Sequence, residues 1–349
     1  MLNDSKRIFL IADFKNDSPK SIRLERRRWL KGLIRLGHDV QPFSFWDIAE
    51  QKCKWPIPIL KHRWEKARTF EVMLEQIRRY HPDILILCVL KYFNPEMIQE
   101  IRKTAPYALL VGRDADSYPP NYAPRWFEIL KMLDLAIVTN AGVWMQKFKE
   151  EGVPRCAFFP CPCDPDIQRP YPNIEGKWKS DILFTGSEHH SRFPAEMEEE
   201  RRFLLERLKE RKGVRLYGCF GFPTLDGIEV FWAISGAKIA LSINIVNNIR
   251  MYHSDRLVNC IACGTFTLAK RVPDSDLLFE DGKHLRYFDT AEEFFELAEW
   301  YLAHEEERER IARAGMEHAH REFNCTKMAR HLMDLIRTGD YNAPWKVIL

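Results

Sequence analysis

Short apolar runs alternate with amphipathic segments through the first half of the chain. In the segment 83–90, every residue after Asp83 is apolar, as in a strand of a parallel sheet that is covered on both faces. Apolar positions at helical spacing separate the runs, so we expect repeated strand–helix units. We predict strands at residues 7–14, 38–45, 83–90, 107–114 and 133–140, and helices at residues 23–36, 64–80, 95–104 and 141–153.

The alternation stops at residues 160–180, which hold five prolines and show no periodicity, and this is the best linker in the chain. It then restarts. We predict strands at residues 181–187, 214–220, 237–245, 265–269 and 284–289, and helices at residues 195–212, 255–263, 292–304, 305–322 and 324–339. The pattern predicts two α/β domains with parallel sheets facing a cleft, where such sheets bind ligands at the carboxyl ends of their strands.

We place the N-terminal domain at residues 1–165, the linker at 166–180 and the C-terminal domain at 181–323. Residues 324–349 would form a C-terminal helix that packs back on the N-terminal domain. A chain of 349 residues is longer than a single hydrophobic core usually supports, so two domains are expected. The composition, with 46% hydrophobic and 30% charged residues, argues against disorder.

The cysteines and the N-terminus favour a cytoplasmic protein. The nine cysteines form no secretory framework, the N-terminal apolar run is too short for a signal peptide, and no segment approaches the 18 apolar residues of a spanning helix.

Charge divides unevenly between the halves. Residues 1–164 carry 27 Lys and Arg against 20 Asp and Glu, a net charge of +7, whereas residues 165–349 carry 26 against 30, a net charge of −4. The first half would therefore face an anionic partner, such as a membrane surface or a lipid-linked acceptor. The alternative is that residues 23–37 form one amphipathic helix with a solvated basic face.

The segment SDRLVNCIACGTF at residues 254–266 has an unusual build. A charged pair, Asp255 and Arg256, begins a predicted helix, and Gly264 follows it directly before a strand. Ser254 or Asp255 would cap this helix, and Gly264 would let the chain turn sharply. The motifs GxGxxG, GxxxxGK[ST], HExxH and GxSxG are all absent, which weakens the case for a nicotinamide oxidoreductase, a P-loop NTPase, a zincin or an α/β-hydrolase.

The second half resembles the C-terminal domain of GT-B glycosyltransferases, most closely the group of CgeB-like spore-maturation proteins. The resemblance runs from about Asp181 to about Leu335 and rests on DILFTGS, VRLYG, AKIALSIN, SDRLVNCIACGTFTLA and CTKMARHLMDL, in that order. It implies a GT-B fold of two Rossmann-like domains and a transferase acting on a nucleotide-diphosphate sugar, with a saccharide or cell-surface glycan as acceptor. It leans toward a retaining mechanism without a metal or other cofactor.

The resemblance also implies donor-binding residues. A sugar nucleotide carries two phosphates, and Arg256 lies at a helix N-terminus, where free N–H groups and the helix dipole favour anions. Arg192 is a second candidate phosphate ligand. The full set of expected donor contacts is Gly186, Ser187, Arg192, Tyr217, Gly218, Asn244, Ser254, Asp255, Arg256, Asn259, Gly264 and Thr265.

The chain departs from the family pattern at Asn259. Many GT-B members have a Glu at this position, three residues after the Arg, and it bonds the donor ribose. Asn still donates and accepts hydrogen bonds, but it is neutral. The earlier acidic residue of the Glu-x7-Glu pattern is also missing, since Met251, Tyr252 and His253 stand in that region.

Three acidic residues of the first half follow predicted strands and are the candidate catalytic groups. Asp114 and Asp116 form a DxD, which holds a divalent metal in GT-A glycosyltransferases. In a GT-B fold we expect them to face the cleft, where with Asp13 they would position acceptor hydroxyls or act as base; the alternative is a solvated turn.

Two other functions stay open. One is a glycosyltransferase of the same fold that modifies DNA, although the chain has no strongly basic domain and nucleic acid is not the partner that we expect. The other is a non-catalytic protein that binds a nucleotide sugar.

Overall fold

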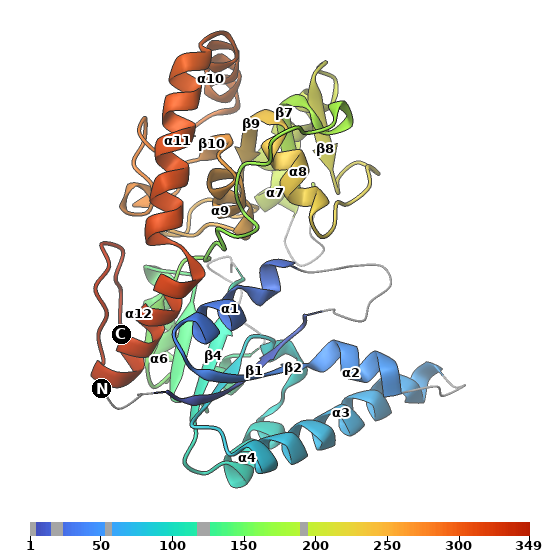
Figure 1. Cartoon of the computed structure of the whole chain (residues 1–349), viewed down its shortest axis with the longest axis vertical. Coiled ribbons are helices and arrows are strands. Elements are labelled where there is room, and N and C mark those ends of the chain that lie inside the picture. The colour runs from blue at the N-terminus through green and yellow to red at the C-terminus, as the bar shows by residue number, and fades with distance from the viewer. Residues whose placement is uncertain (1–4, 15–23, 53–57, 117–125, 189–194) are drawn as a thin grey trace.

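The computed structural model contains two α/β domains with wholly parallel sheets, which confirms the predicted GT-B architecture. It describes residues 5–14, 24–52, 58–116, 126–188 and 195–349. The domains lie one above the other in Figure 1, with the N-terminal domain in blue to green and the C-terminal domain in yellow to red.

The N-terminal sheet has the strand order β2-β1-β3-β4-β5-β6. Its strands are β1 (Arg7–Ala12), β2 (Asp39–Ser44), β3 (Ile84–Leu87), β4 (Leu109–Asp114), β5 (Leu135–Val138) and β6 (Cys156–Phe158). The helices of this part are α1 (Arg28–Arg35), α2 (Phe45–Lys52), α3 (Pro58–Tyr80), α4 (Pro95–Thr104), α5 (Phe127–Leu130) and α6 (Val143–Glu150).

The C-terminal sheet has the strand order β11-β10-β9-β7-β8. Its strands are β7 (Ser180–Thr185), β8 (Val214–Tyr217), β9 (Ala237–Ser242), β10 (Phe266–Lys270) and β11 (Arg286–Phe288). The helices are α7 (Ala195–Lys209), α8 (Glu229–Ser235), α9 (Asp255–Ala262), α10 (Ala291–Ala303), α11 (Glu305–Glu322) and α12 (Cys325–Thr338). Among the described residues, no helix is both long enough and apolar enough to cross a membrane.

Both faces of the C-terminal sheet are buried, because its side chains alternate between two cores. Ile182 and Phe184 of β7 pack with Leu204 and Leu205 of α7. Leu183 points to the other face and packs in a cluster formed by α8 and α9. This alternation with period two is what a strand between two helical layers requires.

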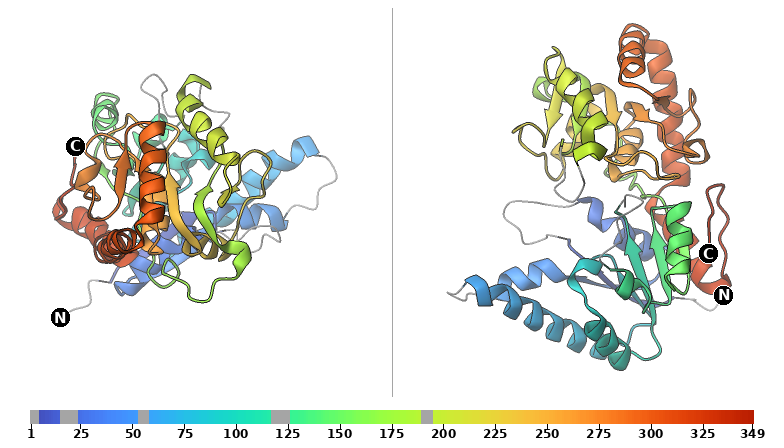
Figure 2. Two further views of the ribbon diagram at one scale, coloured as in Figure 1. Left: turned by 90° about the horizontal axis from the view of Figure 1, so that it is seen from above. Right: turned by 180° about the vertical axis from the view of Figure 1, so that it is seen from behind.

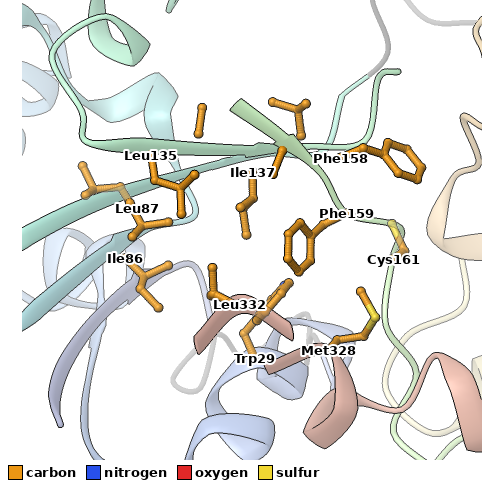
Figure 3. Close-up of a cluster of buried hydrophobic side chains, with 14 of the residues drawn as sticks. Trp29, Ile86, Leu87, Leu135, Ile137, Phe158, Phe159, Cys161, Met328 and Leu332 are labelled. Atoms are coloured by element: carbon orange, nitrogen blue, oxygen red, sulfur yellow. The ribbon is translucent and has the colours of Figure 1, made fainter. Parts of the chain in front are cut away.

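Helix α12 leaves the C-terminal domain and lies along α1 of the N-terminal domain, as Figure 1 and both views of Figure 2 show. Figure 3 shows Trp29 of α1 beside Met328 and Leu332 of α12, with all three facing the apolar side chains of the N-terminal sheet. The last residues continue this return, since the N–H and C=O of Leu349 exchange hydrogen bonds with Cys156 of β6. The chain end therefore completes the N-terminal domain.

Several elements differ from the sequence-based expectation. Strand β1 ends at Ala12, two residues early, and β8 ends at Tyr217, where Gly218 follows with a φ of +79°. Residues 24–27 form a 3-10 turn before α1, so the expected helix is shorter. Helices α2 and α8 and strand β6 were not predicted. The basic face of α1 is not solvated: Arg28 is buried and, like Lys31 and Arg35, contacts residues of the linker or of α9.

Candidate functional site

Two arginines converge on Gly186, just after the carboxyl end of β7. A Cβ atom built on Gly186 would lie 2.7 Å from Nη2 of Arg256 and 3.2 Å from Nη2 of Arg201, so only glycine leaves room for both guanidinium groups. The φ of Gly186 is +141°, a value that side chains disfavour. This glycine thus allows two cations to meet at the edge of the sheet.

The side chain of Arg256 is held in place by hydrogen bonds to backbone carbonyls of two other segments. Its Nε donates to the carbonyl of Thr185 at 2.6 Å and its Nη1 to that of Ile243 at 2.7 Å, and its guanidinium lies 4.5 Å from the centre of the Phe184 ring. Its Nη2 has no hydrogen bond within the described part of the chain, so this nitrogen is the one left for a ligand.

Arg201 of α7 is 4% exposed, and Ser187 accepts a hydrogen bond from its Nη2 through the backbone carbonyl. Burial, and then the charge of Arg256, lower the pKa of Arg201 to about 9. Burial likewise lowers the pKa of Arg256. Two buried like charges oppose each other, and an anion between them would relieve both effects. The arrangement is suited to a diphosphate.

The adjoining residues form the rest of this edge. The N–H of Gly186 donates to the carbonyl of Tyr217 at 2.9 Å, so the ends of β7 and β8 lie together, with Gly218 beside them. Ser254 occupies the N-cap position of α9, but its hydroxyl makes no capping bond, contrary to the expected cap, and it is buried without a partner among the described residues. Its hydroxyl therefore has an unused hydrogen-bonding capacity at the start of α9.

Other predicted donor residues have structural roles. The amide of Asn244 donates to the carbonyl of Tyr252 and accepts from the N–H of Ser254, which ties the loop after β9 to α9. Gly264 has a φ of +75° and makes the expected turn. Thr265 is buried and donates to the carbonyl of Ile234. Both lie at the far end of α9, roughly 12 Å from Arg256 at 1.5 Å per residue. Arg192 lies outside the described residues.

Asp255 and Asn259 face the N-terminal domain. Nη1 of Arg28 donates to Asp255 at 2.8 Å, and its Nη2 donates to Oδ1 of Asn259. The linker residue Gln168 donates to the same Asn259 oxygen at 2.6 Å. Although burial opposes ionisation, Arg28, Arg113 and Arg26 lower the pKa of Asp255. The position of the expected ribose-binding Glu is therefore used for contact between domains.

The three acidic candidates lie at the carboxyl ends of β1 and β4, as predicted for a cleft, but two are held by neighbours. Asp13 accepts hydrogen bonds from the hydroxyl of Tyr92 at 2.7 Å and from the N–H of Trp46. Asp114 is 4% exposed and accepts from Nε1 of Trp126 at 2.9 Å. Asp116 is exposed. Within the described ranges, no three His, Cys, Asp or Glu side chains are grouped so as to hold a metal ion.

Three functional candidates were missed by sequence reasoning. Arg201 lies in a helix rich in charge, where RR at 201–202 gives no sign of which arginine points inward. Arg28 belongs to a run of three arginines, and Arg113 was passed over beside the DxD. In each case the role depends on which face of the helix, or which side of the strand, the side chain lies on. If the start of the element had been predicted accurately, the helical or strand period would have shown which residue faces inward.

Residues 200–334 match the model of a family described as glycosyl transferase-like. Similar solved structures include sucrose-phosphate synthase from Thermosynechococcus elongatus (13% identity, 95% of this chain and 98% of that chain, TM-score 0.65). They also include Anabaena HepE in complex with UDP-glucose (11% identity, 95% and 100%, TM-score 0.62). A third is a putative UDP-N-acetylglucosamine 2-epimerase from Listeria monocytogenes (12% identity, 96% and 96%, TM-score 0.54). No curated protein matches the chain. The chain thus has the GT-B fold, and most of its C-terminal domain matches the glycosyl transferase-like family model.

Proposed function

We propose that this protein is a glycosyltransferase that binds a nucleotide-diphosphate sugar at the edge formed by β7, β8 and α9. The observation that carries the proposal is the convergence of Arg201 and Arg256 on Gly186. The match of residues 200–334 to the glycosyl transferase-like family supports it. The same two cations supply the positive charge for the diphosphate, so we propose transfer without a metal.

The reaction would exchange one bond for another at the anomeric carbon of the sugar. The bond from this carbon to the diphosphate oxygen breaks, and the electron pair leaves with the nucleoside diphosphate. An acceptor hydroxyl oxygen forms the new bond, and its proton passes to the departing diphosphate. Arg201 and Arg256 would stabilise the negative charge that develops on the leaving group, and this is electrostatic catalysis by groups already in place.

We favour retention of anomeric configuration. An inverting enzyme needs a general base opposite the leaving group. Asp13 and Asp114 already accept hydrogen bonds from Tyr92 and Trp126, respectively, which makes each a poorer base. Delivery of the proton to the diphosphate on the same face requires no such carboxylate. These contacts support retention, and the configuration of the product would test it.

We propose uridine diphosphate as the first nucleotide to examine, because HepE, which has the same fold, was crystallised with UDP-glucose. The acceptor would be a saccharide, either a cell-surface glycan or its lipid-linked precursor, on the N-terminal domain. The net charge of +7 in residues 1–164 supports an anionic or membrane-associated acceptor and contact with the inner face of the cytoplasmic membrane.

A thermal-shift panel of UDP, GDP, ADP, CMP and dTDP, each with its common sugars and with or without Mg²⁺, tests the donor site. A ligand at about 100 times its dissociation constant adds about 2.7 kcal/mol to the free energy of unfolding. We expect a shift with one diphosphate that does not need Mg²⁺ and that disappears in Arg201→Met. A shift that needs Mg²⁺ would contradict the metal-free proposal and direct attention to Asp114 and Asp116.

Incubation of the stabilising nucleotide sugar with candidate acceptors then separates the functions. A glycosylated product supports the transferase, whereas binding without transfer or hydrolysis over hours supports a non-catalytic sugar-nucleotide protein. Conversion of the donor to an epimer would support the chemistry named for the Listeria neighbour. Steeply salt-dependent binding to DNA would support the DNA-modifying alternative.

A further inference from the structure

A cavity lies between the domains, on the acceptor side of α9. It is lined by the carboxyl ends of β1, β3 and β4 and by α9, and we call it the cleft cavity. Its charged lining residues are Asp13, Arg26, Arg28, Arg113 and Asp255. Its enclosed volume of about 20 Å³ holds about one water, so a charged group of a ligand would bind at its mouth and a whole sugar would stay outside.

The two carboxylates of this cavity already have cations of their own. Asp255 pairs with Arg28 at 2.8 Å. Asp13 lies 3.8 Å from the ammonium group of Lys91, outside the cavity lining. Arg113 and Arg26 form no hydrogen bond or ion pair with any residue in the described ranges. The lining therefore holds three arginines against two carboxylates, and Arg113 and Arg26 share the charge of Asp255 with Arg28 without contacting it.

The other neighbours of Arg113 make no hydrogen bond or ion pair with it in the described ranges, although Asp255 and Asp114 attract it through space. Arg113 follows Gly112 in β4, and its side chain points away from that of Asp114, because successive side chains of a strand alternate. Asp114 is turned to Trp126. The thiols of Cys88 and Cys161 remain neutral, because burial raises the pKa of both, that of Cys161 to about 12.

We propose that the cleft cavity binds an anionic group, a carboxylate or a phosphate, carried by the acceptor saccharide. Arg113 would donate to this group from the floor of the cleft and Arg26 from its exposed rim. This inference rests on the proposed function, since it assigns an acceptor class to the same cleft. Arg113 and Arg26 line this cavity with Asp255, whereas Arg201 and Arg256 meet at Gly186, so the anion would be held apart from the diphosphate.

The test is isothermal titration calorimetry on the full chain saturated with UDP. The probes are glucuronate, glucose 6-phosphate and the neutral methyl α-glucoside. We expect at least one anionic probe to bind at least tenfold more tightly than the neutral one, because a hydrogen bond to a charged group contributes about one to two factors of ten in affinity. The two anionic probes distinguish a carboxylate from a phosphate acceptor.

Three variants locate the binding. Arg113→Gln should weaken binding of the anionic probe about tenfold or more and leave the affinity for UDP unchanged. Arg26→Gln should also weaken binding of the anionic probe. Because Arg26 is exposed, this variant should fold normally, so it still tests the proposal if Arg113→Gln fails to fold. Arg79→Gln removes an equal charge from the end of α3, where Arg79 is 79% exposed on its side chain, and should change neither affinity.

Equal binding of the neutral and anionic probes would overturn the proposal. Full retention of anion binding in Arg113→Gln would also overturn it. If only Arg201→Met lost anion binding, the anion would lie at the donor site, and the proposal would again be wrong. If the protein does not bind UDP but still binds the anionic probe through Arg113, the proposed donor is wrong, whereas the anion site is supported.

Discussion

Arg28 and Asp255 form an ion pair of 2.8 Å between the two domains. Arg28 is 2% exposed on α1, whereas Asp255 is the first residue of α9 and precedes Arg256, the arginine that we propose binds the donor. The same guanidinium also donates to Asn259, one turn further along α9. The N-terminal domain therefore holds the helix that carries Arg256, and Arg28 acts as a positioning residue.

Arg28→Met should separate donor binding from transfer. The methionine keeps the apolar stem but leaves Asp255 and Asn259 without their shared donor, so we expect a loss of about 1–3 kcal/mol in the free energy of unfolding by urea. The dissociation constant of UDP should stay near that of the wild type, because Arg201 and Arg256 are intact, whereas kcat should fall. Arg79→Met is the matched control. Loss of UDP binding in Arg28→Met would place Arg28 in the donor site instead.

Asn259→Ala tests the unusual residue at the ribose position. Its Oδ1 accepts from both Arg28 and Gln168, so its removal leaves two donors unsatisfied at the interface. We expect the free energy of unfolding to fall by about 1–3 kcal/mol and the affinity for UDP to change little. Urea denaturation and UDP titration measure the two effects. The opposite pattern, stable protein with weak UDP binding, would show that Asn259 contacts the ribose after all.

Arg201→Met and Arg256→Met should have opposite effects on the protein without ligand. Burial, and then the charge of Arg256, lower the pKa of Arg201, so removing this buried cation should leave the melting temperature the same or raise it. Removing Arg256 deletes hydrogen bonds to Thr185 and Ile243, so the melting temperature should fall. Both variants should lose the shift with UDP. A persistent UDP shift in either variant would exclude that arginine from the donor site.

The sequence predicted the fold because each strand of a parallel sheet leaves a local mark. The run ILIL at residues 84–87 is wholly buried, and the linker interrupts the pattern visibly. Helix α8 was missed because EVFWAIS is short and its apolar residues are as compatible with a strand. Strand β6 is only three residues long, and it pairs with a chain end that lies almost 200 residues away in the sequence.

The site was harder to predict because its chemistry depends on direction. The pattern placed Arg256 at the start of a helix, where it does lie. It did not show that Asp255 and Asn259, which are four positions apart on α9, turn to Arg28 of the other domain. Nor could it show that Arg201, 15 residues after Gly186, comes back to that glycine. Such contacts depend on how distant elements pack together, and the local hydrophobic pattern does not predict this.

Asp164 makes the stability depend on pH. This linker carboxylate is fully buried and accepts from Lys31 and Arg35 of α1. Burial opposes its ionisation, but these cations lower its pKa below the usual value near 3.8. A lowered folded-state pKa contributes stability that is complete above the unfolded-state pKa and is lost as the pH falls through the folded-state value.

We therefore expect the free energy of unfolding to decrease from about pH 5 toward pH 3, and less steeply in Asp164→Asn. The variant should be less stable than the wild type at pH 7, and the gap should narrow at pH 3. Urea denaturation at each pH measures this. Glu128→Gln, which breaks an exposed ion pair with Lys131, should have a small effect throughout. A constant gap for Asp164→Asn across this range would contradict the assignment.

Gly32→Ala should weaken the contact that returns α12 to the N-terminal domain. In an exposed helix this substitution would stabilise by up to about 1 kcal/mol, since Gly is the poorer helix former. Here a Cβ atom would lie 2.2 Å from the carbonyl oxygen of Cys325 and 3.1 Å from Cβ of Ala329, so α1 and α12 must move apart. We expect a net loss of about 1–3 kcal/mol on urea denaturation. Gly176→Ala, with no atom within 4 Å of the new Cβ, is the control and should change stability little. A more stable Gly32→Ala protein would show that the two helices do not meet at Gly32.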